Sequence, residues 1–262
     1  MGEGVDPNPR FLAEKIVDPE ALLMGKTAEN LHDRFPHLTK ERVDAYAVAS
    51  QEKTAKAYAD GKIQPDLVPV ALRSAEKGYG LATADEPPRP GTSMESLAGL
   101  KTPFRPHGRV TAGNACPLND GAAATIVMSD TKAAELGITP LARIVSSGVS
   151  GLNPEIMGLG PIEAVRQALK RAGMSIDDID LVEINEAFAA QVVPSARELG
   201  IPWDKLNVNG GSIALGHPFG MTGARIMTTL IHGLQDADKT FGLETMCVGG
   251  GQGMAMIVER LS

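Results

Sequence analysis

Three short segments of the sequence carry side chains that can move a proton or hold a developing negative charge. Asn185 and Glu186 follow a buried apolar run, and His217 stands between a glycine and a proline. Cys247 closes another apolar run and is followed, after one valine, by three glycines. A thiol with a tuned pKa can act as base or acid near neutrality, and amide or imidazole groups can stabilise an oxyanion. These three segments are therefore candidates for a functional site.

Each of these residues also has a purely structural interpretation. Asn185 can be the N-cap of a helix, and Cys247 can be an inert buried hydrophobe. The glycines after Cys247 can instead form a concavity of backbone N–H groups that stabilises a thiolate. His217 is harder to explain by packing, because five glycines lie around it between Asn207 and Arg225. On the residues alone, both interpretations of Asn185 and of Cys247 stay open.

Alternating strand and helix patterns from residue 122 onward predict a layered α/β domain. Strands are expected at 122–128, 140–146, 179–184, 206–208, 241–247 and 253–259. Helices are expected at 130–136, 161–172, 186–199 and 222–234. Ligands of open α/β sheets bind at the carboxyl ends of strands. The three chemistry-bearing segments end or follow successive strands, so they can converge on one site.

The first 118 residues are predicted to form helices separated by long loops. One helical pattern starts at Thr27, and another runs from residue 43 to about 60. The second follows Thr39, whose spacing to Arg42 is that of an imperfect capping box. The stretch 65–106 contains seven prolines and no sustained period, which predicts mostly loop. Long loops in compact domains usually carry function.

Composition argues against several classes of protein. The chain has 262 residues, is 43% hydrophobic and carries a formal net charge of -7, which argues against nucleic-acid binding. No apolar run approaches the ~20 residues of a membrane span. Two cysteines are too few for a disulfide framework, which favours the cytoplasm. No metal-ligand spacing or dinucleotide fingerprint occurs. A local positive balance between Arg89 and Arg109 can attract nucleotide phosphates, or can be a solvated loop face.

Five stretches resemble the thiolase family and occur in the family's order. They are MGKTAENL, GRVTAGNACPLNDGAAATIVMS, NEAFAAQ, NVNGGSIALGHPFGMTGAR and CVGGGQGMAMIVE. The resemblance implies an α/β fold of the thiolase-like layered α/β/α type. It also implies reversible thiolytic cleavage of a 3-oxoacyl-CoA, or Claisen condensation of acetyl-CoA in the other direction. The segments AGNACPLNDG and GLETMCVGGGQGMAMIVERL are most similar to those of actinobacterial thiolases, including a steroid side-chain type.

The resemblance also implies roles for individual residues. Cys247 matches the acid/base cysteine, His217 the histidine that activates the nucleophile, and Asn185 the asparagine that holds an oxyanion-hole water. Coenzyme A and acyl-CoA are implied as substrates, with no tightly bound cofactor and no metal. Contacts with CoA are implied at Met24, Arg89, Ala112, Cys116, Leu118, Phe188 and Gly249.

Two departures from the family concern the CoA contacts. Cys116 stands where many members have a serine, and Leu23 replaces a histidine common before the Met-Gly pair. CoA binding is still expected, with altered detail.

By the same resemblance, residues 1–118 form a CoA-binding loop domain and 119–138 a remnant of the N-terminal thiolase half. Residues 139–262 form the C-terminal thiolase domain. The family's nucleophilic cysteine, followed by Ser-Gly, does not occur in the sequence, and Cys116 belongs to another motif. We therefore expect the first α/β half to be mostly absent, with an apolar edge and face exposed.

A chain of this kind is expected to work as a homo-oligomer, dimer or tetramer, or with a complementary N-terminal half. The alternative is a catalytically inactive relative that binds acyl-CoA or scaffolds an assembly. A ketosynthase relative is disfavoured, because that class has a second histidine where this chain has Cys247.

Overall fold

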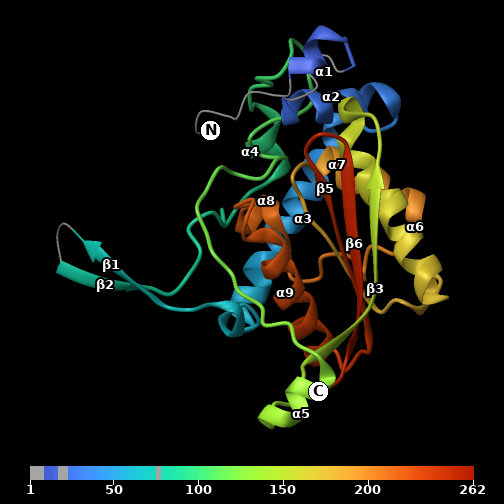
Figure 1. Ribbon diagram of the computed structural model, residues 1–262. Helices are drawn as coiled ribbons and strands as arrows, with labels where there is room; N and C mark the ends of the chain where they lie inside the picture. Colours follow the sequence, from blue (N-terminus) through green and yellow to red (C-terminus); the bar gives the residue numbers. More distant parts are fainter. Residues whose placement is uncertain (1–8, 17–22, 75–77) are drawn as a thin grey trace.

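The computed structural model describes residues 9–16, 23–74 and 78–262 (Figure 1). The helices of the N-terminal part are α1 (Pro9–Ala13), α2 (Met24–Arg34), α3 (Lys40–Ala59), η2 (Gln64–Asp66) and α4 (Met94–Ala98). Those that follow are α5 (Asp130–Leu136), η3 (Pro154–Leu159), α6 (Gly160–Ala172), η4 (Ile176–Asp178), α7 (Ala189–Leu199), α8 (Ser212–Leu215) and α9 (Thr222–Asp236). The strands are β1 (Val70–Ser74), β2 (Gly78–Ala82), β3 (Ala142–Gly151), β4 (Leu181–Ile184), β5 (Phe241–Val248) and β6 (Gln252–Arg260).

The central sheet has four strands in the order β3-β6-β5-β4. β6 pairs antiparallel with both β3 and β5, and β4 pairs parallel with β5. Because β4 and β5 are parallel, their carboxyl ends lie at the same edge of the sheet. The residues that follow Ile184 and those around Cys247 are therefore brought to one place.

Helices cover both faces of this sheet (Figure 1). On one face, α6 and α7 pack against alternate apolar residues of the strands, such as Val182, Leu243 and Ile257. On the other face, Leu230 and Leu234 of α9 pack against the alternating set that includes Leu181 and Val258. The alternation is the period of two expected for a sheet buried on both sides. The predicted layered α/β fold is confirmed.

The N-terminal helices lie over the carboxyl-end edge of the sheet (Figure 1). α3 begins after Thr39, whose side chain accepts a hydrogen bond from the Arg42 backbone N–H, so the expected cap is confirmed. α2 is tied to the later loop by Glu29, which is buried and accepts from the backbone N–H groups of Arg109 and Val110. The Glu29 contacts hold α2 against the loop at 109–110.

Most of the expected elements from residue 130 onward form, with shifted boundaries. α7 begins at Ala189 and not at Glu186, because the preceding residues make other contacts. The expected strand 206–208 was wrong: Leu206 makes only an isolated parallel bridge with Val182. The stretch 65–106 is not simply loop, since β1 and β2 form an antiparallel hairpin with Val70 opposite Ala82. Figure 1 shows this hairpin standing away from the body.

The expected strand at 122–128 does not form. This segment is extended without sheet pairing, and Ile126 and Val127 are 86% and 73% exposed. A strand needs a neighbour for its backbone hydrogen bonds, and none of the described strands lies beside it. The helix expected after it, α5, forms and ends at Gly137 in the left-handed conformation. The remnant proposed at 119–138 therefore has its helix but not its strand.

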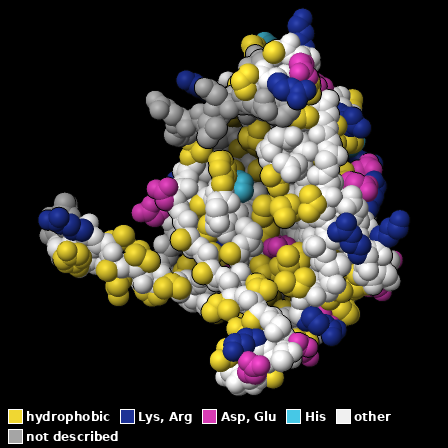
Figure 2. All heavy atoms as spheres, viewed as in Figure 1, with side chains coloured by type: hydrophobic (Ala, Val, Ile, Leu, Met, Phe, Trp, Pro, Cys, Tyr) yellow, Lys and Arg dark blue, Asp and Glu magenta, His cyan; other side chains and the backbone are white. Residues whose placement is uncertain are grey.

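The expected apolar exposure is confirmed. Large hydrophobic side chains that are exposed by half or more include Leu118, Ile126, Val127, Val149, Phe219 and Met254. Figure 2 shows apolar side chains gathered over the face that the 118–128 segment crosses, and along the hairpin. Exposed apolar patches are typical of interaction surfaces.

Candidate active site

Asn185 directly follows β4 and is held at the edge of the sheet. Its backbone N–H donates to the carbonyl oxygen of Thr245 in β5, at 2.9 Å. The side chain is 1% exposed. The N-cap interpretation is wrong, because the residue before α7 is Phe188. The buried Asn185 amide is thus available for a contact other than capping.

That contact is with the imidazole of His217. The Asn185 Nδ2 atom lies 3.3 Å from Nε2 and 3.4 Å from Nδ1 of the ring. The other end of the amide, Oδ1, accepts from the hydroxyl of Ser212 at 2.6 Å. Two of the three residues singled out in the sequence are therefore direct neighbours.

The tautomer of His217 follows from its second contact. The hydroxyl of Thr222 donates its only hydrogen to the carbonyl oxygen of Pro218, at 2.9 Å. It must therefore accept from Nδ1–H of His217, 2.6 Å away. This leaves Nε2 with a free lone pair, the form that can take a proton. Burial, with the positive charge of Arg225, lowers the pKa of His217 to about 4, so the ring is neutral at pH 7.

Cys247 lies in β5 near its carboxyl end and is 8% exposed. Its thiol donates to Oε1 of Gln191, with 2.8 Å between Sγ and the oxygen. The Gln191 Nε2 atom donates in turn to the backbone carbonyl oxygen of Asn185, at 3.3 Å. Gln191 therefore bridges the thiol and the asparagine. Burial raises the pKa of Cys247 to about 12, so the thiol is protonated.

Three of the expected CoA-contact residues pack in one apolar cluster with Cys247. Met24, Cys116 and Phe188 belong to the same apolar cluster as Cys247. Cys116 is fixed by its backbone N–H, which donates to the carbonyl oxygen of Ala187 at 3.0 Å. Burial raises the pKa of Cys116 to about 11. We call the three residues Met24, Cys116 and Phe188 the apolar wall.

Gly249 lies at the edge of this apolar wall. A Cβ atom added to Gly249 would stand 3.8 Å from the Met24 sulfur, which is ordinary contact. The turn that follows Cys247 is therefore adjacent to the start of α2.

Glu186 anchors the segment that carries Ser212 and leads to His217. Its buried carboxylate accepts from Tyr46, from Ser50, from Asn207 and from the Ile213 backbone N–H, at 2.7 to 3.0 Å. A Cβ at Gly211 would lie 2.3 Å from this carboxylate, so only glycine allows the approach. The glycines of this motif thus let the backbone pass close to a buried charge, and the contact holds the segment in place.

Arg89, Ala112 and Leu118 are not members of the apolar cluster that contains Cys247, although the backbone N–H of His217 donates to Oδ1 of Asn119, the residue after Leu118, at 3.1 Å. Ala112 and Leu118 are exposed, Leu118 by 75%. The Arg89 guanidinium donates to three carbonyl oxygens of its own loop, those of Glu86, Pro87 and Pro88. Their expected roles in CoA binding stay predictions.

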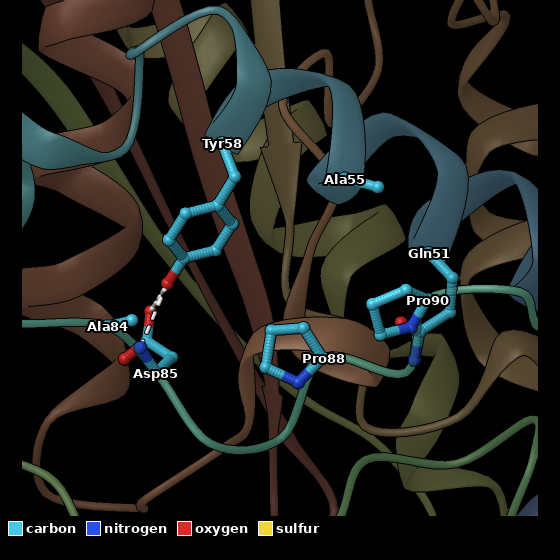
Figure 3. Close-up of a pocket in the computed structure, with 7 residues that line it drawn as sticks. All are labelled: Gln51, Ala55, Tyr58, Ala84, Asp85, Pro88 and Pro90. Carbon is cyan, nitrogen blue, oxygen red and sulfur yellow. Dashed lines mark hydrogen bonds between the residues drawn. The ribbon is translucent and has the colours of Figure 1, made fainter.

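A hollow of about 320 Å³ lies between α3 and the loop 84–90, and it is lined by Pro88 and Pro90, the neighbours of Arg89 in the sequence. The residues that line it are Gln51, Ala55, Tyr58, Ala84, Asp85, Pro88 and Pro90 (Figure 3). The Tyr58 hydroxyl donates to the Asp85 carboxylate at 2.7 Å and accepts from its backbone N–H, which closes one end. The hollow is therefore mostly apolar with a polar rim.

Two of the positive residues between Arg89 and Arg109 have structural partners. Arg105 forms a bidentate pair with Asp33 and lies 3.5 Å from Glu29. Arg109 donates to the carbonyl oxygen of Leu38 at 2.8 Å. These two side chains hold the loop onto α2 and the turn that follows it.

Sequence reasoning missed the partners Gln191, Ser212, Thr222 and Arg225. All four lie inside stretches already singled out, but their types are ordinary and gave no chemical signal of their own. Among the described residues, no group of three or more His, Cys, Asp or Glu side chains is placed to hold a metal. None of the helices in the described part of the chain is long and apolar enough to cross a membrane.

Comparison with known families matches two domain models to this chain. The N-terminal domain of thiolase matches residues 12–131, and the C-terminal domain of thiolase matches residues 138–260. The first match takes in both the helices that cover the site and the unpaired segment at 122–128.

Curated relatives agree with this assignment. An acetyl-CoA acetyltransferase of Thiocystis violacea is 48% identical over 91% of this chain and 60% of its own length. A 3-ketoacyl-CoA thiolase of Marinomonas is 46% identical over all of this chain and 67% of its own length. The chain thus spans about 60% of the length of several curated relatives.

Solved structures have the same fold. The Bacillus anthracis acetyl-CoA acetyltransferase superposes with a TM-score of 0.88 at 45% identity, over 91% of this chain and 60% of that one. Human mitochondrial 3-ketoacyl-CoA thiolase in complex with CoA superposes with a TM-score of 0.83 at 41% identity, over 91% and 59%. By its sequence and its fold, this chain belongs to the thiolase family.

Proposed function

We propose that the chain supplies the proton-transfer and oxyanion groups of a thiolase site, which cleaves 3-oxoacyl-CoA thiolytically or condenses acetyl-CoA in reverse. The supporting observation is the chain of contacts from Cys247 through Gln191 to Asn185 and from Asn185 to His217. The nucleophilic cysteine of this proposal comes from outside the 262 residues, since Cys116 precedes a proline and Cys247 a valine.

In the cleavage direction, the nucleophile's thiol gives its proton to Nε2 of His217, which has a free lone pair. The thiolate attacks the 3-oxo carbon, and the bond between the second and third carbons breaks. The electron pair stays on the second carbon of the departing acetyl-CoA enolate, which takes the proton of the Cys247 thiol. A thiol that is protonated at rest suits this first step.

In the second half of the reaction, the Cys247 thiolate takes the proton of incoming CoA. The CoA thiolate attacks the acyl-enzyme carbonyl, and acyl-CoA leaves as the nucleophile recovers its proton from His217. Both tetrahedral and enolate oxygens carry negative charge, which His217 and a water held by the Asn185 amide stabilise. Removing one such donor typically costs ~2.7–4 kcal/mol.

For CoA we propose an entry along the apolar wall of Met24, Cys116 and Phe188, with Gly249 at its edge. Ala112 and Leu118 would then contact the pantetheine from the exposed side. The apolar hollow beside Arg89 suits the adenine end, because a flat base fits between proline rings and the arginine can turn to a phosphate. No tightly bound cofactor enters the reaction.

We further propose a cytoplasmic, homo-oligomeric protein or a complex with a Cys-bearing thiolase half. Two free cysteines and the exposed apolar face support this. The amino-acid sequences of the motifs suggest steroid side-chain acyl-CoA as the substrate class. Comparing kcat/KM for a steroid side-chain 3-oxoacyl-CoA with that for acetoacetyl-CoA tests it, and equal or lower values for the steroid substrate would reject it.

Thiolysis of acetoacetyl-CoA, followed by loss of absorbance, tests the proposed function. We expect turnover when the chain is combined with a Cys-bearing thiolase half, and its loss in Cys247→Ala. Binding of CoA without turnover in the combined protein would favour the second candidate, an inactive acyl-CoA-binding or scaffold subunit. The contact between Asn185 and His217, and the link from Asn185 to Cys247 through Gln191, favour the enzyme.

A further inference from the structure

The amide of Asn185 can present either its NH2 group or its oxygen to His217, and only the NH2 group donates. We propose that Ser212, itself held by Arg225, is a positioning residue that fixes this amide with its NH2 group toward His217. The kinetic consequence rests on the proposed function, whereas the orientation of the amide does not.

The first argument is the direction of the hydrogen bonds. Nη2 of Arg225 donates to Oγ of Ser212 at 2.6 Å. A guanidinium has donors only, so Ser212 must accept here and its own hydrogen is free for another acceptor. Oδ1 of Asn185 lies 2.6 Å away and takes it. The oxygen end of the amide is thereby fixed on Ser212, and the nitrogen end points to the ring.

The second argument comes from the ring. The Thr222 contact places the hydrogen of His217 on Nδ1, which leaves the lone pair on Nε2. The amide nitrogen lies 3.3 Å from Nε2 and 3.4 Å from Nδ1, so the NH2 group stands over the face of the ring, where N–H groups are favoured. The lone pair of Nε2, in the plane of the ring, stays free for the nucleophile's proton. A reversed amide would set an oxygen against this electron-rich face, which is unfavourable unless the ring is protonated. The neutral ring and the contacts from Arg225 through Ser212 therefore favour the same orientation of the amide.

Burial makes this arrangement consequential. Ser212 is 0% exposed and Asn185 is 1% exposed, so water competes little for the amide. Within the described residues, Nε and Nη1 of Arg225 have no hydrogen-bond partner, and Ser212 is the acceptor that holds the guanidinium. If Ser212 no longer donates to it, the buried amide oxygen is left without a hydrogen-bond donor, which costs free energy because water cannot replace the lost partner. The amide can then flip, so that its oxygen and its NH2 group exchange places.

A pH titration of His217 by NMR, in the full 262-residue chain, tests the inference. In Ser212→Ala the amide oxygen can turn to the ring, where it accepts from the protonated form. We expect the pKa of His217 to rise by about one unit from its value of about 4. Arg225 is the charged group among the described residues that acts on this ring, and the substitution keeps it.

Ser195→Ala is a matched control. Ser195 is also 0% exposed, and its hydroxyl has no hydrogen-bond partner in the described part of the chain. Its removal should leave the titration of His217 unchanged. Ser212→Cys keeps the size of the side chain with a weaker donor, and should shift the pKa in the same direction by less.

A second readout is thiolysis by the combined protein. We expect kcat to fall at least about tenfold in Ser212→Ala, with KM unchanged, because a donor used in the transition state is turned away. An unshifted His217 in both Ser212→Ala and Ser212→Cys would overturn the inference. A shifted His217 in a protein without thiolysis would instead sustain it and reject the proposed function.

Discussion

Gln191 accepts the thiol hydrogen of Cys247, with 2.8 Å between sulfur and oxygen, and donates to the backbone of Asn185. The glutamine is 1% exposed, so both hydrogen bonds are shielded from solvent. This one side chain therefore connects the end of β5 with the residue that follows β4. It explains why a thiol far along the chain from Asn185 belongs to the same group of side chains.

The protonated state of Cys247 predicts slow alkylation in the folded protein. With a pKa of about 12, about 10⁻⁴ of the thiol is ionised at pH 8. In a Cys116→Ser background, iodoacetamide labelling followed by mass should be slow at pH 8 and should accelerate steadily up to pH 11. The denatured chain, as control, should label at the rate of an ordinary thiol. Fast labelling of the folded protein at pH 7 would show an ionised cysteine and contradict this assignment.

Replacing Asn185 should slow the reaction without unfolding the protein. We expect Asn185→Ala to lower kcat in thiolysis ~100-fold or more, because an oxyanion donor is lost. The matched control is Asn153→Ala, which removes a cap of η3 outside the group of contacts around Cys247 and His217. Unchanged turnover in Asn185→Ala would remove the asparagine from the mechanism.

Two glutamates lie opposite each other on neighbouring strands, the buried Glu183 in β4 and the partly buried Glu244 in β5. Burial raises the pKa of each to about 8, and Oε2 of Glu244 has no hydrogen-bond partner among the described residues. Since the folded pKa lies above the unfolded one, these groups stabilise the fold fully only below about pH 4.5. That stabilisation is lost as the pH rises through 8.

Glu244→Gln should therefore stabilise the protein at alkaline pH. We expect urea unfolding at pH 9 to give a free energy about 1–3 kcal/mol higher than that of the unaltered protein. At pH 4.5 the two should be nearly equal. Glu198→Gln, on the exposed side of α7, should change neither value. A Glu244→Gln protein that is less stable at pH 9 would show that the carboxylate is paired when charged.

Glu186 is the opposite case, a buried carboxylate with four donors. Glu186→Gln replaces one accepting oxygen by an NH2 group that faces donors, so unfolding free energy should fall by about 2 kcal/mol or more. Chemical denaturation at pH 7 measures it, with the exposed Glu52→Gln on α3 as the control. A loss no larger than that of the control would mean that Glu186 does not hold the segment before His217.

Much of the fold was predictable because its signals are local. Alternating apolar residues located β4, β5 and β6, and glycines after helices marked the ends of α5, α6 and α7. The strand expected at 122–128 failed because an apolar pattern supplies side chains but not a neighbouring strand. The hairpin of β1 and β2 was not predicted, because the prolines of the stretch 65–106 favour mostly loop and the stretch has no sustained period.

The site was predictable only in part. Asn185, His217 and Cys247 stood out by type and by the glycines or strand ends beside them. Their partners Gln191, Ser212 and Arg225 did not, since a hydrogen bond between distant residues leaves no pattern in the sequence. The start of α7 was misplaced for the same reason, because Glu186 turns into the core to meet donors from α3.

The central claim is that Asn185, His217 and Cys247 form one acyl-CoA site. A crystal structure of the protein with bound CoA tests it most directly. We predict that the CoA sulfur lies within hydrogen-bond distance of Cys247 Sγ, beside Nε2 of His217, with the pantetheine along Met24 and Phe188. A CoA molecule whose sulfur lies on another surface, with these side chains out of contact, would contradict the account.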